Sequence, residues 1–359
     1  MKPLDDDEPG AAAEESQAGL DLVTESSQDD DAQDKTARTI TWKRWLGMGI
    51  TLVLIVIAIL LLLRACAKEV PESVTVVAAG DMACDAKDPA MKKKNRDMNQ
   101  CRFKEVSDIA VSLQPDALLG LGDYQYEVPK AEAYQDIYGP TWGRLRSITL
   151  PAIGNQELKV FEANTFRQYF GERAGPPEGY WSTELGRWHV VVLNSNCTVV
   201  IGGCGEGSPQ QIWLTEDLAA NDSKCTLAIM HHPRWSTGIA GPDGRTDALY
   251  RTLDQGGVDI LLSGHEADYE RFGQLDADGN PSMEGVRQFV VGTGGQAVYR
   301  PEQGAAPWRN KGVLIESEYA DFEHHGVLEL QLDPDRYSWA FHSLDTKKPI
   351  TDSGSSPCR

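Results

Sequence analysis

The chain has 359 residues, a formal net charge of −20 and a pI near 4.7. Such an acidic chain repels phosphate backbones, which argues against a nucleic-acid partner. Hydrophobic residues make up 41% of the sequence, enough for a large buried core in one or two domains.

The first 45 residues form an acidic segment. They carry 12 Asp or Glu and 5 Lys or Arg, with few large apolar side chains. A segment of this composition cannot bury enough apolar surface to fold. We therefore predict a disordered acidic cytoplasmic tail over residues 1–45, without a specific binding role.

An uncharged apolar run of 18 residues follows, from Leu46 to Leu63. This length is about the minimum for a helix that crosses a membrane, so we predict a transmembrane helix over residues 46–64. Positive charges are more frequent before the run than after it, which places the N-terminus in the cytoplasm. The sequence thus predicts a single-pass protein of the cell membrane whose C-terminal domain is extracytoplasmic.

Two processed forms are alternatives to the uncleaved anchor. Ala65-Cys66-Ala67 resembles the small-x-small site of a cleaved signal peptide, and Leu63-Arg64-Ala65-Cys66 faintly resembles a lipoprotein cleavage site. The 45-residue leader and the long apolar run favour the anchor. Arg64 also fits the lipoprotein pattern badly.

Six cysteines remain when Cys66, at the membrane edge, is set aside. An even number in an exported domain favours disulfides, and six cysteines allow 15 connectivities. Pairing of near neighbours would give Cys84–Cys101 and Cys197–Cys204. That would leave Cys225 to bond Cys358, but the sequence alone does not decide between the connectivities.

The exported part alternates between strands and helices after a linker at residues 65–72. Apolar runs predict strands at residues 73–79, 117–121, 148–153, 225–230, 258–262 and 288–291. Helical periodicity or capping predicts helices at residues 101–113, 208–221 and 246–253. Hairpins are expected at residues 179–194 and 326–341. The pattern predicts an α/β (α+β) sandwich over residues 73–359, with two packed mixed sheets flanked by helices.

Five polar segments follow apolar runs, where open α/β folds build their sites. They begin at Gly80-Asp81, Gly122-Asp123, Gly154-Asn155, Met230-His231 and Gly264-His265. Hard oxygen ligands mixed with imidazoles suit zinc, manganese or iron better than softer metals. The sequence therefore predicts a metal site at these strand ends.

In this order, the segments resemble the calcineurin-like metallophosphoesterase superfamily. The Gly-Asp-x-x-Tyr and Gly-Asn-x-Glu segments resemble its purple acid phosphatase branch, and the resemblance covers about residues 75–345. It implies a sandwich of two mixed sheets, two divalent or trivalent metal ions, and hydrolysis of phosphate esters.

The resemblance also implies a role for each matching residue. Asp81 and the phenolate of Tyr126 would bind the first metal, and Asp123 would bridge both metals. The remaining ligands of the second metal would be Asn155, His231 and His265. A bridging carboxylate holds two cations close enough to activate a water between them.

Two family histidines are replaced in this chain. Gln156 stands where the family has a histidine that contacts substrate or protonates the leaving group, which makes position 156 a catalytic position. Ala267 stands where the family has an imidazole ligand of the first metal. We therefore expect one well-formed metal site and one weakened site. Glu266 or Asp268 would compensate only through a local bulge.

Three further residues are candidates for contact with substrate. His232 follows a metal ligand and is a candidate catalytic residue, although a packed histidine fits the sequence equally well. Arg234 and Arg271 are candidate phosphate contacts, with surface ion pairs as the alternative.

The sequence leaves two functions open. One is a membrane-anchored extracytoplasmic phosphoesterase that acts on a phosphorylated small molecule or another phosphoester. The other is a pseudoenzyme that binds a ligand or a protein partner of unknown identity without turnover. The retained ligands favour the first function, and Gln156 and Ala267 favour the second.

Overall fold

The computed structural model describes residues 42, 45, 46, 48–59, 71, 73–92, 100–299, 301, 308–310, 312–347 and 349–359. The chain divides into two units, Met1–Glu69 and Val70–Arg359. In the first unit, residues 48–59 are helical.

The predicted membrane span is only partly covered by the described residues. Within them, no helix combines the length and the apolar character needed to cross a membrane. Residues 47 and 60–64 of the predicted span lie outside the described part of the chain, as do nearly all of the predicted tail and linker.

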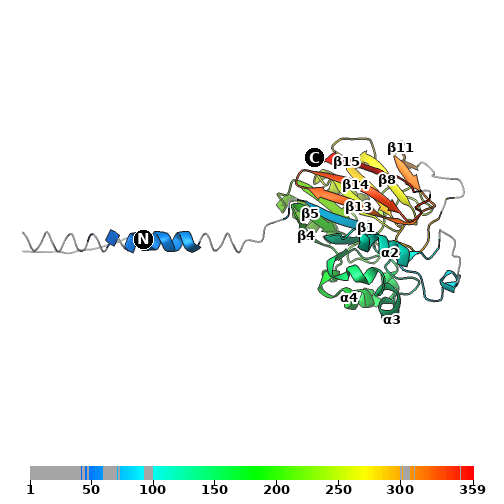
Figure 1. Ribbon diagram of the computed structural model, residues 1–359. Coiled ribbons are helices and arrows are strands. Elements are labelled where there is room, and N and C mark those ends of the chain that lie inside the picture. The colour runs from blue at the N-terminus through cyan, green and yellow to red at the C-terminus, as the bar shows by residue number, and fades with distance from the viewer. Residues whose placement is uncertain are drawn as a thin grey trace, which may run out of the picture. The chain divides into compact units, whose positions relative to one another are not determined.

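The second unit contains two large sheets. The six-stranded sheet has the order β15-β14-β13-β1-β2-β3, and Figure 1 shows β14, β13 and β1 side by side. Its strands are β1 (Val74–Ala79), β2 (Ala117–Gly120), β3 (Thr149–Pro151), β13 (Gly326–Asp333), β14 (Arg336–Ser343) and β15 (Ser353–Pro357). Strands β1, β2 and β3 are parallel, so their carboxyl ends share one edge.

The seven-stranded sheet has the order β12-β8-β9-β7-β6-β5-β4. Its strands are β4 (Trp181–Leu185), β5 (Trp188–Val192), β6 (Cys225–Ile229), β7 (Ile260–Ser263), β8 (Tyr269–Leu275), β9 (Val286–Val291) and β12 (Tyr319–Asp321). Strands β5, β6, β7 and β9 are parallel. A small sheet pairs β10 (Trp308–Asn310) with β11 (Val313–Ile315).

The α-helices of the second unit are short. They are α2 (Phe103–Ser112), α3 (Ala131–Ala133), α4 (Asn164–Phe170), α5 (Pro209–Ala220) and α6 (Asp247–Gln255). Helix α5 begins as its sequence predicts, with Pro209 in the first turn and the Ser208 hydroxyl accepting a hydrogen bond from the Gln211 N–H.

The central parallel strands, such as β2, β5, β6 and β7, are buried on both faces, which explains their continuous apolar runs. Val76 of β1 and Leu227 of β6 belong to one core between the two sheets. On the opposite face of β1, Val77 packs in a cluster with Val106 of α2. Leu214 of α5 belongs to a third cluster, on the outer face of the seven-stranded sheet. Two packed sheets flanked by helices confirm the predicted fold class.

Three disulfides join the six cysteines as pairing of near neighbours predicts. Cys84 bonds Cys101, Cys197 bonds Cys204, and Cys225 bonds Cys358. The last bond links β6 to the residue that follows β15, across a sequence separation of 133 residues. It therefore ties the edge strand of one sheet to a central strand of the other.

This long disulfide should contribute more stability than the short ones. In the chain-entropy model, closing a loop of 133 residues stabilises by about 5 kcal/mol and closing one of 7 residues by about 2 kcal/mol. We expect Cys225→Ala with Cys358→Ala to lower the free energy of unfolding more than Cys197→Ala with Cys204→Ala, measured by denaturant titration. Equal losses would contradict this expectation.

Candidate metal centre

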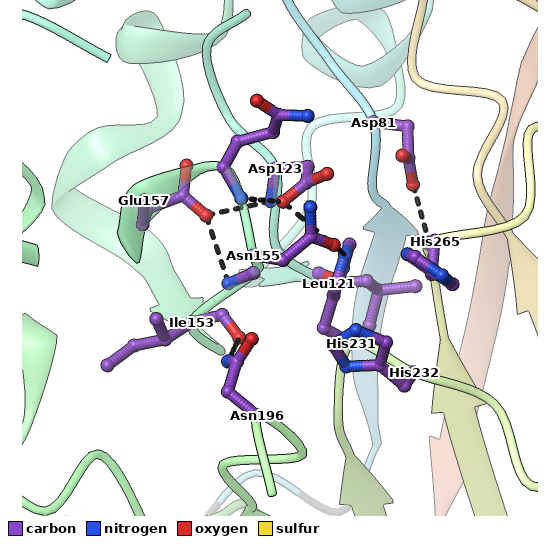
Figure 2. Close-up of polar contacts among 12 residues, drawn as sticks. Asp81, Leu121, Asp123, Ile153, Asn155, Glu157, Asn196, His231, His232 and His265 are labelled. Carbon is purple, nitrogen blue, oxygen red and sulfur yellow. Dashed lines mark hydrogen bonds and ion pairs between the residues drawn. The ribbon is translucent and has the colours of Figure 1, made fainter. Parts of the chain in front are cut away.

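The site residues lie where parallel strands of the two sheets end. Asp81 follows β1, Asp123 follows β2, and His265 follows β7 (Figure 2). All three have positive φ angles, 55°, 54° and 70°. Residues other than glycine rarely adopt this conformation, which costs about 1–3 kcal/mol each and is concentrated at functional sites.

Tyr126 lies between the two aspartates. Its hydroxyl oxygen is 2.6 Å from Asp81 Oδ1 and 2.8 Å from Asp123 Oδ2, and both carboxylates are 2% exposed. Burial and the charge of Asp123 raise the pKa of Asp81 to about 7. Burial and the two carboxylates raise the pKa of the Tyr126 phenol well above its usual value.

His231 lies at the centre of the arrangement and is fully buried. Its Nδ1 is 2.8 Å from the Leu121 carbonyl oxygen, and its Nε2 is 2.9 Å from Asn155 Oδ1 and 3.3 Å from Asp123 Oδ1. Burial opposes charge on the ring, but Asp123 and Asp81 raise the pKa of His231 to about 9. Both ring nitrogens thus face oxygen atoms, which favours the charged form of the ring.

These donors fit a metal ion. Asp123, Asn155 and the Nε2 of His231 surround one point, and two buried carboxylates there are balanced by a single imidazolium. A cation at this point would replace the Nε2 proton and leave Nδ1 bonded to a backbone carbonyl, as is usual for a histidine that binds metal. Carboxylate, amide oxygen and imidazole together suit zinc, manganese or iron.

Glu157 fixes the two loops that carry Asp123 and Asn155. Its fully buried carboxylate accepts hydrogen bonds from the N–H groups of Asp123 (2.9 Å), Tyr124 (3.0 Å) and Gly154 (2.9 Å). Burial and the charge of Asp123 raise the pKa of Glu157 to about 7. The ends of β2 and β3 are thus held together by one side chain.

Two more histidines approach His231. The ring centroids of His231 and His265 are 5.1 Å apart, and those of His232 and His265 are 4.4 Å apart. His232 Nδ1 lies 2.9 Å from the hydroxyl of buried Ser195. Burial and the charge of His231 lower the pKa of His265 to about 4 and that of His232 still further. Both rings are therefore neutral, the form that binds metals.

Two cavities flank the histidines. The first, of about 300 Å³, is lined mainly by acidic and apolar residues, Asp81, Tyr126, Glu127, Ile239, Ala240, His265, Glu266, Ala267, Gln296 and Tyr299. The second, of about 230 Å³, has basic residues in its lining and comprises Asn155, Leu158, Lys159, Ser195, Asn196, Thr198, Val199, His232 and Arg245.

The two replaced positions both lie near the site. Ala267 lines the first cavity beside Asp81 and Tyr126, so space remains where the family places an imidazole. Gln156 is 8% exposed, and its backbone N–H donates to Asp123 Oδ1 at 2.8 Å. Its side-chain Oε1 is buried without a hydrogen-bond partner.

The two carboxylates beside Ala267 turn toward a neighbouring loop. Residues 265–268 form bends, and β8 begins only at Tyr269. Glu266 Oε2 accepts a hydrogen bond from the Ala240 N–H at 3.2 Å. A Cβ atom on Gly238 would lie 2.5 Å from both Glu266 Oε2 and Asp268 Oδ2, so both carboxylates pack closely against this loop.

The two candidate arginines lie outside the lining of both cavities. Arg234 Nη2 is 2.8 Å from Asp247 Oδ1, and its guanidinium lies 3.7 Å above the Trp235 ring. Arg271 pairs with Asp352 at 2.9 Å and also contacts Glu318. Both guanidinium groups thus lie away from the two cavities beside the histidines, and their contact with substrate stays a prediction.

Arg245 and Ser195, which the sequence analysis did not single out, both line the second cavity. Arg245 forms an ion pair with Asp243 at 2.6 Å in the loop before α6, and its charge lowers the pKa values of His232 and His265. In the sequence, this arginine cannot be told from one in an ordinary surface loop.

Removal of the Glu157 charge should loosen the junction of the two loops. In Glu157→Gln, an amide NH₂ would face at least one of the buried N–H donors, so we expect the free energy of unfolding to fall by at least about 2 kcal/mol. Exposed Glu162 is the matched control, and Glu162→Gln should stay within about 0.5 kcal/mol of the native chain. Denaturant titration measures both, and equal effects would contradict the role of Glu157.

Comparison with known proteins places this site in a family. Residues 74–269 match the model of the calcineurin-like phosphoesterase family. No curated protein matches the chain at a significant level.

Solved structures share the fold at low sequence identity. A purple acid phosphatase from yellow lupin (Lupinus luteus) seeds superposes with a TM-score of 0.60 at 18% identity, over 80% of this chain and 54% of that protein. This chain thus spans about half the length of the lupin enzyme. GAP50, the anchor in the inner membrane complex of Plasmodium, superposes with a TM-score of 0.53 at 11% identity, over 80% of this chain and 90% of that one.

A third structure, PhoD, gives a TM-score of 0.51 at 10% identity, over 81% of this chain and 70% of that one. These identities establish a shared fold, and the family match covers more than half of the 359 residues. The chain therefore belongs to the calcineurin-like phosphoesterase family.

Proposed function

We propose that the chain is a metal-dependent phosphoester hydrolase that works chiefly through one well-formed metal site. The observation that carries this proposal is the convergence of Asp123, Asn155 and His231 on one point, with His265 beside them. The family binds a pair of metal ions, and the donor set of this chain suits iron, zinc or manganese.

The residues around the metal position would bind and orient a phosphoester. A bound metal would supply positive charge and a water of lowered pKa. Arg245, in the second cavity, offers a cation to a phosphate group that the acidic domain would otherwise repel. The Leu121 carbonyl holds the His231 ring with Nε2 toward Asn155.

The first metal position is weaker in this proposal. Asp81, Asp123 and Tyr126 remain there, but Ala267 supplies no ligand atom and leaves a cavity. An ion with three oxygen ligands would bind less tightly than one that also has imidazole ligands. We expect a metal content closer to one ion per chain than to two.

We propose that the domain works outside the cytoplasm on a membrane anchor. The apolar run from Leu46 to Leu63 supports the anchor. The three disulfides support an oxidising compartment, because such bonds persist mainly in exported domains. A phosphorylated small molecule or another exposed phosphoester would be the substrate.

A binding protein without turnover is the second candidate. Gln156 cannot donate a proton at neutral pH as a histidine does, and Ala267 removes a metal ligand. The Plasmodium protein of similar fold is described as an anchor, which shows that this fold also serves structural roles. If this chain is a binding protein, it would bind a ligand or a protein at the cell surface.

Restoring both histidines should raise turnover. We expect Gln156→His with Ala267→His to hydrolyse an aryl phosphate about 10²–10⁴-fold faster than the native chain, because a proton donor returns. The assay uses the full chain with Mn²⁺, Zn²⁺ or Fe³⁺, together with a measurement of bound metal. Gln168→His with Ala220→His, at two exposed positions outside the site, is the matched control.

The outcomes separate the two functions. Metal-dependent turnover by the native chain supports the hydrolase, whereas turnover by the restored variant alone supports the binding protein. If the native chain already equals the restored variant, the proposed weakening by Gln156 and Ala267 is wrong.

Arg245 should bind the phosphate group. We expect Arg245→Gln to weaken binding of inorganic phosphate to the metal-loaded chain by about 10–100-fold, the size of a lost hydrogen bond to a charged group. Arg251→Gln is the matched control, because Arg251 is also ion-paired but lies outside the lining of both cavities. Calorimetry measures both, and equal effects would refute the role of Arg245.

A further inference from the structure

Three histidines come together at the ends of β6 and β7. One ring nitrogen of each of His231, His232 and His265 lies within 4.8 Å of one ring nitrogen of the other two. His231 is fully buried and His232 is 6% exposed. The family pattern accounts for His231 and His265 as ligands, and it leaves the role of His232 open.

The hydrogen bonds of His231 and His232 are alike. His231 Nδ1 contacts the Leu121 carbonyl oxygen at 2.8 Å, and His232 Nδ1 contacts the Ser195 hydroxyl at 2.9 Å. Ser195 Oγ also accepts a hydrogen bond from the His232 backbone N–H at 2.8 Å, which fixes the hydroxyl in place. The Leu121 carbonyl accepts from Nδ1–H of His231, and the Ser195 hydroxyl accepts from Nδ1–H of His232 in the tautomer that leaves its Nε2 for a metal, the usual arrangement for a histidine ligand.

The separations of the rings fit a shared ion. Two nitrogens bound to one zinc ion at tetrahedral angles lie about 3.3 Å apart, since each Zn–N distance is about 2.0–2.1 Å. The three nitrogens, all within 4.8 Å of one another, thus need to approach by at most about 1.5 Å. The ring centroids are 4.4, 4.8 and 5.1 Å apart, so each ring contacts the other two, edge-on or tilted.

We propose that His232 is a third imidazole ligand, so that one ion is bound by His231, His232 and His265 together. Oxygens of Asp123 and Asn155 lie beside His231 Nε2 and would complete its coordination. His232 is then a metal ligand rather than a proton donor to a leaving group. The inference concerns metal binding and holds whether or not the domain hydrolyses a substrate.

A site with three imidazoles favours particular metals. Imidazole nitrogens are ordinary ligands of zinc, whereas manganese prefers oxygen ligands. The chain lacks an imidazole at the first metal position, where Ala267 stands, and His232 adds one at the second. We therefore expect this site to bind Zn²⁺ more tightly than Mn²⁺.

The test counts imidazole ligands directly. The full-length chain is loaded with one equivalent of Zn²⁺, and zinc K-edge X-ray absorption gives the number of imidazoles around the ion. We expect three in the native chain and two in His232→Ala, with zinc affinity reduced at least about 100-fold in that variant, beyond the loss typical of an outer-shell residue. His342→Ala is the matched control and should leave both values unchanged, because His342 lies on β14 and its ring is hydrogen-bonded to Glu329 of β13.

A second variant separates a ligand from a packed side chain. Ser195→Ala keeps the His232 ring but removes its hydroxyl partner, so we expect three imidazoles and about 10–100-fold weaker zinc binding. Two imidazoles in the native chain would overturn the inference, and this measurement does not depend on whether any variant folds. Three imidazoles without turnover would leave the inference standing and refute only the hydrolase.

Discussion

The carboxylate of Glu157 is the contact on which the arrangement of the site depends most directly. It accepts hydrogen bonds from backbone N–H groups in the loop after β2 and in the loop after β3. Those donors are buried, and each would lack a partner without it. Since the two loops carry Asp123 and Asn155, one side chain sets the spacing between a carboxylate and an amide oxygen that face the same imidazole.

The other site residues are brought together by the topology and packing of the two sheets. Parallel strands bring their carboxyl ends to one edge of each sheet, and the packing of the two sheets brings those edges together. The backbone then turns sharply into left-handed conformations at Asp81, Asp123 and His265. The fold tolerates this strain because the surrounding hydrogen bonds hold each loop; the N–H of His265, for example, donates to Asp81 Oδ2 at 2.8 Å.

Much of this could be predicted from the sequence, because apolar runs mark buried parallel strands and polar residues at their ends mark the site. Residues 131–147 and 157–174 escaped prediction, since they fold into short helices and 3₁₀ or π turns without a lasting period. Strand β15 was missed because Ser353–Pro357 is too polar to resemble a strand. Arg245 and Ser195 approach the histidines from loops, and their positions depend on tertiary packing alone.

The two cavities differ in the charge of their linings, so the site is electrostatically asymmetric. Carboxylates of Asp81, Glu127 and Glu266 line one side of the histidines, while Lys159 and Arg245 line the other. The electric field of the site would therefore orient an entering molecule that has an anionic head and an apolar tail. Its head would turn toward the basic side and its tail toward Ile239 and Tyr299, so that selection among ligands would begin with polarity, before any bond to a metal forms.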